Sequence, residues 1–188
     1  MDSWLKFKKS ALEKLKDALE KEEVDKPIIP LLNRLNGLDD YVTTSSCSGR
    51  MIFISEREKK GESEKLVAWH YIPSFDEFKE EFEYWKLKEN VWFKVEGFIL
   101  HVVTHSFDNA IKLFKWAKIK GVKRGGVQPI RNGRFLIELI GTAYMGLPLK
   151  AICNLNEIYK ESVKRMEINF KALKKLEQSV NEISKQKC

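Results

Sequence analysis

Two stretches of the sequence, WHYIPSFDEF (residues 69–78) and LHVVTHSFDNA (residues 100–110), share a pattern that decides the expected fold. Each stretch begins with a strand-like apolar run that carries a histidine, and each continues through Ser-Phe-Asp into a helical pattern. A serine at this place can accept a hydrogen bond from the first turn of the helix. The two stretches therefore predict a repeated β-α-β unit, although a coincidence of two similar helix caps would give the same pattern.

Helices are expected to flank these strands at both ends of the chain. Apolar residues at spacings of three and four predict an amphipathic helix over residues 3–23 and a long C-terminal helix over about 155–185. Residues 56–64 are expected to form a turn or loop, and Asn132-Gly133 a hairpin turn. The expected strands cover residues 41–46, 50–55, 65–71, 91–103 with a break at Gly97, 127–130, 134–140 and 147–153. We therefore expect one domain, residues 1–188, of the α+β class with a mixed or mainly antiparallel sheet.

The balance of charge favours a polyanionic partner. The 188 residues include 34 lysines and arginines against 27 aspartates and glutamates, for a formal net charge of +7. A surface that is merely rich in lysine would also produce this balance. The three cysteines are far apart, so we expect neither a disulfide framework nor a bound metal. The apolar runs are too short to span a bilayer, so we expect a cytoplasmic protein with no membrane partner.

The segment TTSSCSGR, residues 43–50, gathers small hydroxyl side chains, a thiol and an arginine ahead of an apolar run. Backbone N–H groups near a glycine, serine hydroxyls and a guanidinium together suit a carboxylate, a phosphate or a ribose. A β-turn whose serines bond their own backbone is the structural alternative. Cys47 could also act as a nucleophile, with His70 or His101 as its base. The sequence has no glycine-rich phosphate loop, so a doubly wound, Rossmann-type sheet is not expected.

Residues 109–137 contain eight basic side chains and no acidic one. Glycines in the same segment let the loop backbone approach a ligand closely. Such a segment is typical of a nucleic-acid surface that contacts mainly phosphates, although a solvated helix face and loop would also be basic. The residues that we expect to contact a nucleic acid are Lys120, Lys123, Arg124, Arg131 and Arg134.

The segment TTSSCSGR also resembles the S-x-S-S-C-x-G-R signature of the tRNA wybutosine-synthesizing protein 3 family. Three later stretches are similar to that family in the same order, namely KLVAWHYIP, VEGFILHVVTHSFDNAIKLFKWAKIKGVKRGG and GLPL. The resemblance covers roughly residues 1–180. Two positions depart from the family's pattern: Thr43 replaces the first serine, and TAYMG before Pro148 lacks an acidic residue.

The resemblance implies an S-adenosylmethionine-dependent methyltransferase that acts on N4 of a 4-demethylwyosine-type base. That base is built from the guanosine 3′ to the anticodon of tRNA(Phe), and no obligate protein partner is expected. We assign the methyl donor to Thr43, Ser45, Ser46, Gly49 and Arg50, and the tRNA to the basic residues named above. The candidate catalytic residues are Cys47, His70 and His101, with the histidines as candidate bases. A tRNA-binding module without chemistry and a thiol-dependent enzyme that uses Cys47 are the alternatives.

Overall fold

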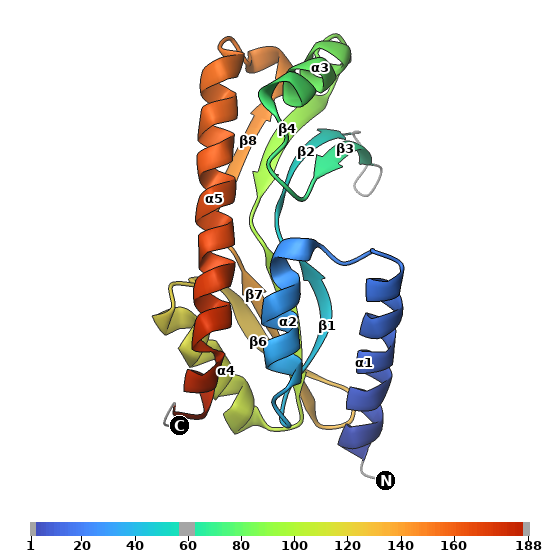
Figure 1. Ribbon diagram of the computed structural model, residues 1–188, viewed down its shortest axis with the longest axis vertical. Helices are drawn as coiled ribbons and strands as arrows, with labels where there is room; N and C mark the ends of the chain where they lie inside the picture. Colours follow the sequence, from blue (N-terminus) through green and yellow to red (C-terminus); the bar gives the residue numbers. More distant parts are fainter. Residues whose placement is uncertain (1–2, 57–62, 186–188) are drawn as a thin grey trace. The chain divides into compact units, whose positions relative to one another are not determined.

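The computed structural model describes residues 3–56 and 63–185 (Figure 1). Contacts within the chain divide it into two compact units. The first unit comprises residues 1–48, 98–142 and 170–188, and the second comprises residues 49–97 and 143–169. This division describes contacts within the chain. The expectation that residues 1–188 form one domain stays a prediction. The turn expected over residues 56–64 lies mostly outside the described residues.

A four-stranded antiparallel sheet with the order β1-β5-β7-β6 organises the first unit. Its strands are β1 (Val42–Cys47), β5 (Ile99–Thr104), β6 (Arg124–Ile130) and β7 (Arg134–Ile140). Its helices are α1 (Ser3–Glu20), η1 (Lys26–Ile28), α2 (Ile29–Asn36), α4 (Phe107–Ile119), the last part of α5 (Leu155–Ser179) and η3 (Val180–Lys185).

Successive side chains of a strand point to opposite faces of the sheet. In this sheet, different helices cover the two faces. One face contributes to the main core with α2, α4 and the C-terminal residues, through Leu35, Leu100, Trp116, Ile137 and Leu176. On the other face, Val42 and Val103 pack with Trp4 of α1. Farther along that second face Ile99 is 40% exposed, so α1 leaves this end of the sheet open to solvent.

The second unit contains its own four-stranded antiparallel sheet, in the order β3-β2-β4-β8. Its elements are β2 (Arg50–Ser55), β3 (Glu64–Trp69), α3 (Phe75–Trp85), β4 (Val91–Glu96), β8 (Tyr144–Pro148), η2 (Leu149–Ala151) and the first part of α5. Four aromatic side chains, Phe53, Trp69, Phe78 and Phe93, pack together with ring centroids 5.1–6.0 Å apart. Aromatic contacts of this kind dominate the energetics of a small core.

Each unit contains one of the β-α-β connections that the sequence predicts. In the second unit β3 and β4 both pair antiparallel with β2, so they run parallel to each other and α3 connects them. In the first unit β5 and β6 both pair with β7, and α4 connects them. Ser74 and Ser106 accept hydrogen bonds from the N–H groups of Glu77 and Asn109 and so cap the two helices. The predicted α+β class with antiparallel sheets is confirmed.

The predicted bounds are wrong near Pro148. A strand was expected over residues 147–153, whereas β8 ends at Pro148 and the short helix η2 follows. Proline has no N–H to donate to a strand ladder and fixes φ near −65°, which favours the start of a helical turn. The predicted hairpin is confirmed, since Ile130 pairs with Arg134 and both Asn132 and Gly133 have positive φ. The C-terminal helix is confirmed as α5, continued by η3.

Candidate functional site

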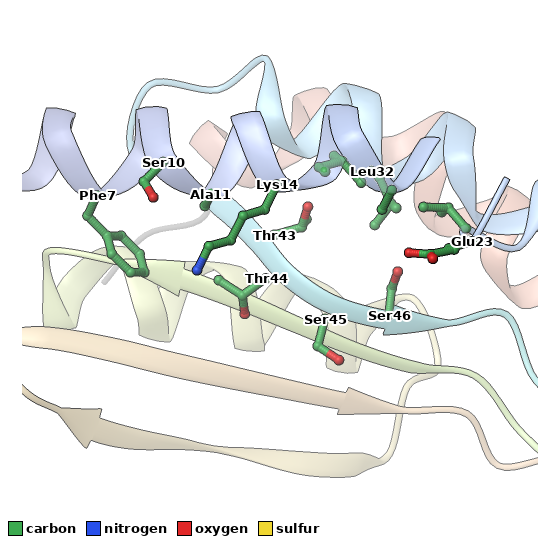
Figure 2. Close-up of a pocket in the computed structure, with 13 residues that line it drawn as sticks. Phe7, Ser10, Ala11, Lys14, Glu23, Leu32, Thr43, Thr44, Ser45 and Ser46 are labelled. Atoms are coloured by element: carbon green, nitrogen blue, oxygen red, sulfur yellow. The ribbon is translucent and has the colours of Figure 1, made fainter. Parts of the chain in front are cut away.

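A cavity of about 580 Å³ lies between α1 and β1 in the first unit (Figure 2). Its walls are one side of α1, the segment after that helix, Leu32 of α2, and the four consecutive β1 residues 43–46. The structure thus brings three predicted donor-binding residues, Thr43, Ser45 and Ser46, to one cavity. The volume lies within the usual range for small-molecule sites.

The cavity combines charged, hydroxyl and apolar groups. Figure 2 shows Lys14 pointing from α1 toward Thr44, and the carboxylate of Glu23 facing Ser46. Apolar side chains complete the wall, including Phe7, Leu15, Val24 and Leu32. Such a lining suits a ligand that has both a charged end and an apolar ring.

Hydrogen bonds hold the hydroxyl-rich strand in place. The amide of Asn36, at the end of α2, donates to Thr43 Oγ1 at 2.8 Å and accepts from the Thr43 N–H at 2.8 Å. The N–H of the fully buried Ser48 donates to Asp25 Oδ2 at 2.7 Å. Thr43 therefore anchors β1 to α2, while the exposed Ser45 keeps its hydroxyl at the surface.

A bulge in β1 decides which hydroxyl lies beside His101. Thr43 pairs with Val102 and Ser45 pairs with His101, so Thr44 is the extra residue of the bulge. Directly opposed residues of antiparallel strands point to the same face. Ser45 and His101 are therefore neighbours on the face of the sheet that α1 covers only in part.

The same row continues across the sheet to its other edge. His101 pairs with Glu138 of β7, and Glu138 pairs with Gly126 of β6. His101 Nε2 lies 3.0 Å from Glu138 Oε1, and the two side chains are 27% and 40% exposed. We call Ser45, His101, Glu138 and Gly126 the cross-strand row. It begins at the cavity and ends at the edge strand β6.

The cross-strand row has the chemistry of a general base. If the Nε2–H of His101 donates to the carboxylate of Glu138, Nδ1 keeps its lone pair and can accept a proton. The carboxylate then stabilises the imidazolium that forms. Two predicted residues, Ser45 and His101, meet in this arrangement, whereas Glu138 is a partner that the sequence reading missed.

Cys47 and Gly49 lie at the far end of β1 and just beyond it. Cys47 pairs with Ile99, in the next row on the same face as Ser45. Gly49 belongs to the second unit and has φ of +91°, and a Cβ there would lie 2.8 Å from the carbonyl oxygen of Glu96. The backbone therefore requires a glycine at this position. The roles of Cys47 in catalysis and of Gly49 in donor binding stay predictions.

Arg50 and His70 also belong to the second unit. Arg50 Nε donates to Glu96 Oε2 at 2.7 Å, and both side chains are partly buried. Arg50 therefore has a local structural role, which agrees with the structural alternative that was given for residues 43–50. His70 follows directly after β3 and is half-buried. A donor contact by Arg50 and proton acceptance by His70 stay predictions.

The five basic residues expected at a nucleic acid differ in their availability. Lys120 is only 16% exposed and lies 2.7 Å from the carboxylate of Glu182. The guanidinium of Arg134 lies 4.1 Å from the ring centroid of Phe7, a cation–π contact. The side chains of Lys123, Arg124 and Arg131 are exposed. Contact of these residues with tRNA stays a prediction, and the exposed three are its strongest candidates.

A second, smaller hollow of about 260 Å³ lies at the other end of the cross-strand row. Residues 125–128 of β6 and Glu138 of β7 line it. One signal in the sequence could have located it, because the Asn132-Gly133 turn sets a register that places Glu138 opposite Gly126. The link from Glu138 to His101 required the pairing of β5 with β7, which local patterns do not reveal.

The chain is similar in sequence to a family of methyltransferases. The family described as Methyltransferase TYW3 matches residues 6–184. A Pyrococcus furiosus protein named tRNA(Phe) 7-((3-amino-3-carboxypropyl)-4-demethylwyosine(37)-N(4))-methyltransferase 1 is 34% identical over 192 residues, which is 92% of this chain and 97% of that protein. A Methanocaldococcus jannaschii protein named as the same kind of methyltransferase is 32% identical over 78% of this chain and 77% of its own length. These matches confirm the resemblance predicted from the signature.

Solved structures show the same fold. The PH1069 protein from Pyrococcus horikoshii has a TM-score of 0.84 and 32% identity, and the match covers 94% of this chain and 95% of that one. A hypothetical protein from Aeropyrum pernix has a TM-score of 0.74 and 25% identity, with coverage of 86% and 100%. Among the described residues of this chain, no helix is long and apolar enough to cross a membrane.

Proposed function

This chain belongs to the TYW3 methyltransferase family, and on that premise we propose that it transfers a methyl group from S-adenosylmethionine to tRNA(Phe). The acceptor we propose is N4 of 7-(3-amino-3-carboxypropyl)-4-demethylwyosine at position 37, the base in the names of its relatives. The observation that carries the proposal is the cavity of about 580 Å³ that opens beside Ser45, with His101 as the next residue of the cross-strand row.

The lining of the cavity fits the methyl donor in its chemistry. S-Adenosylmethionine has an adenine ring, a ribose diol, and an amino-acid end with an ammonium and a carboxylate. Phe7 and Leu15 suit the ring, Lys14 suits the carboxylate, and Glu23 suits the ammonium or the diol. When bound, the donor supplies a methyl group on a positively charged sulfur, which makes the methyl carbon open to attack.

The attacking nitrogen carries a hydrogen, so the reaction also needs a proton acceptor. As the nitrogen–methyl bond forms and the methyl–sulfur bond breaks, the proton leaves the nitrogen for Nδ1 of His101. Glu138, 3.0 Å from Nε2, holds the ring in this tautomer and stabilises its positive charge. Alignment of the nitrogen with the methyl group provides much of the remaining acceleration.

The exposed cations at one edge of the first unit suit the tRNA backbone. Lys123 precedes β6 and Arg124 begins it, so both lie near the end of the cross-strand row at Gly126. Arg131 follows the other end of the same edge strand. Phosphates bound by Lys123 and Arg131 would let the modified base enter the row past Arg124 toward His101. A tRNA substrate supports a cytoplasmic location, which is part of this proposal. The proposed chemistry requires no second protein.

The direct test is methyl transfer by the purified chain. Incubate it with S-adenosylmethionine and with tRNA(Phe) that lacks only this methyl group, and analyse the nucleosides by mass spectrometry. The proposal expects the modified nucleoside to gain the mass of one methyl group. Binding of tRNA without donor binding and without this gain would instead favour the tRNA-binding module.

A further inference from the structure

The hollow at the edge of the sheet exists because residue 126 has no side chain. A Cβ built at Gly126 would meet no atom within 4 Å, and the backbone there has none of the positive φ that favours glycine. Gly125 is different, since its φ is +131° and a Cβ would lie 2.0 Å from the carbonyl oxygen of Glu138. The fold therefore requires Gly125 but not Gly126. What Gly126 provides is open space beside Glu138.

Groups of opposite charge lie in or next to this space. Glu138 lies directly opposite Gly126, and Gln128, two positions farther along β6, also lines the hollow. Arg124 lies two positions before Gly126, at the start of β6. Diagonal neighbours such as Arg124 and Glu138 have their Cα atoms roughly 7–8 Å apart, so both side chains can reach one small ligand. Arg124 forms no ion pair within the part of the chain that the structure describes, and Glu138 uses one oxygen toward His101.

A carboxylate and an amide that line the hollow, with a guanidinium two positions along the same strand, match the two ends of an α-amino acid. The carboxylate can accept hydrogen bonds from an ammonium, and the guanidinium can bind a carboxylate through two parallel bonds. The base in the names of the relatives carries such a group, the 3-amino-3-carboxypropyl arm. The same row holds His101, beside which the ring of that base would lie during methyl transfer.

We propose that the hollow over Gly126 receives the 3-amino-3-carboxypropyl arm of the base, with its ammonium at Glu138 and its carboxylate at Arg124 and Gln128. This inference rests on the proposed function. The amino-acid end of S-adenosylmethionine has the same chemistry, but the cavity with Lys14 and Glu23 at the Ser45 end of the row already suits that end. The hollow therefore selects the substrate and not the donor.

The test compares two tRNA(Phe) substrates, one with the arm on its 4-demethylwyosine base and one with the same base lacking the arm. The wild-type chain should prefer the substrate with the arm by roughly ten- to a hundredfold in kcat/KM, which is the size expected for charge-assisted hydrogen bonds. Gly126→Val fills the hollow without backbone strain, so the ratio between the substrates should fall to about one. Arg124→Gln should reduce the same ratio. Pro129→Val is the matched control, because Pro129 is exposed on the same strand and faces the other way, and its ratio should stay at the wild-type value.

The outcomes separate the inference from the function it rests on. Methylation of neither substrate by the wild-type chain would overturn the proposed function itself. An active wild-type chain without a preference for the arm, or a Gly126→Val variant that keeps the preference, would overturn the inference alone. A weaker equilibrium affinity for S-adenosylmethionine in Gly126→Val would assign the hollow to the donor and would also overturn it. Gly126→Ala, measured in parallel with a thermal melt, provides a smaller side chain should the valine variant fold poorly.

Discussion

Each unit contains a strand-helix-strand connection of the same kind, but the sheets that contain these connections have different roles. In the second unit the ring cluster of Phe53, Trp69, Phe78 and Phe93 makes that sheet part of an aromatic core. In the first unit the corresponding sheet presents the cross-strand row of Ser45, His101, Glu138 and Gly126 on a partly open face. The strand-helix-strand connection fixes where the strands and the helix lie. The side chains decide whether a face of the sheet forms a packed core or a functional site.

The two histidines of the repeated pattern illustrate this difference. His70 follows the last residue of β3, whereas His101 lies inside β5, between the strands β1 and β7. A position inside a sheet gives a side chain fixed neighbours on both adjacent strands. For His101 these neighbours are Ser45 and Glu138, and the contact of Nε2 with Glu138 orients its ring.

The largest effect on stability is expected in the aromatic cluster of the second unit. Phe53→Ala removes a fully buried ring that contacts three others, and it should lower the unfolding free energy by about 3–5 kcal/mol. Phe107→Ala in the first unit is the control, because Phe107 is 54% exposed and should lose less than about 1 kcal/mol. Chemical denaturation of both variants measures the two losses. Equal losses would contradict the assignment of the stabilising ring cluster to the second unit.

Gly49 and Gly126 differ in whether the backbone requires a glycine at that position. Gly49→Ala in the second unit forces a Cβ against the carbonyl oxygen of Glu96 at positive φ, so it should cost roughly 1–3 kcal/mol of unfolding free energy. Gly126→Ala in the first unit meets open space and should change that free energy by no more than about 0.5 kcal/mol. Thermal melts of the two variants measure the loss of stability in each. A destabilised Gly126→Ala would mean that this glycine serves the fold and not a ligand.

Removal of the exposed cations tests whether the first unit carries the tRNA surface. Changing Lys123, Arg124 and Arg131 to alanine should weaken tRNA binding and reduce its dependence on salt. Each lost phosphate contact reduces the magnitude of the negative slope of log K against log salt by up to about 0.9, the value for duplex DNA. The control changes Lys79, Lys88 and Lys160, three exposed lysines of the second unit, and removes the same charge. If the control reduces the magnitude of the slope as much as the test variant does, tRNA does not dock on this edge of the first unit.

The smallest effect is expected at Cys47, which lies on the same face as Ser45 but one row away from His101. Methyl transfer to a ring nitrogen needs no covalent bond to the enzyme, and serine keeps the size and hydrogen bonding of cysteine. Cys47→Ser should therefore retain most of the methyl transfer rate. Complete loss of turnover with unchanged donor binding would support the thiol-dependent alternative.

Local patterns in the sequence predict much of the fold. The serine caps at Ser74 and Ser106, the Asn132-Gly133 turn and the periodic apolar residues of α1 and α5 each depend on a few neighbouring residues, and the structure contains all of them. The same kind of pattern located the hydroxyl-rich strand. It could not show that Lys14 of α1 shares a cavity with that strand, because this contact depends on how α1 packs on β1.

The cross-strand row needed information that a single sequence does not contain. His101 and Glu138 are 37 residues apart, and their contact depends on the pairing of β5 with β7. The bulge at Thr44 then decides that Ser45 is the hydroxyl opposite His101. Because a shift of one residue moves every side chain of a strand to the other face, register is the step at which sequence patterns fail here.

The most direct test of the central claim is the single-turnover rate of methyl transfer for a matched pair of variants, His101→Gln and His70→Gln. If the proton passes to the first unit's histidine, His101→Gln should slow the reaction by roughly 10²- to 10⁴-fold, the usual contribution of a general base. His70→Gln should slow it much less, while both variants keep their thermal stability and their affinity for S-adenosylmethionine. A loss in His70→Gln that equals or exceeds the loss in His101→Gln would contradict the assignment of the proton acceptor to the cross-strand row.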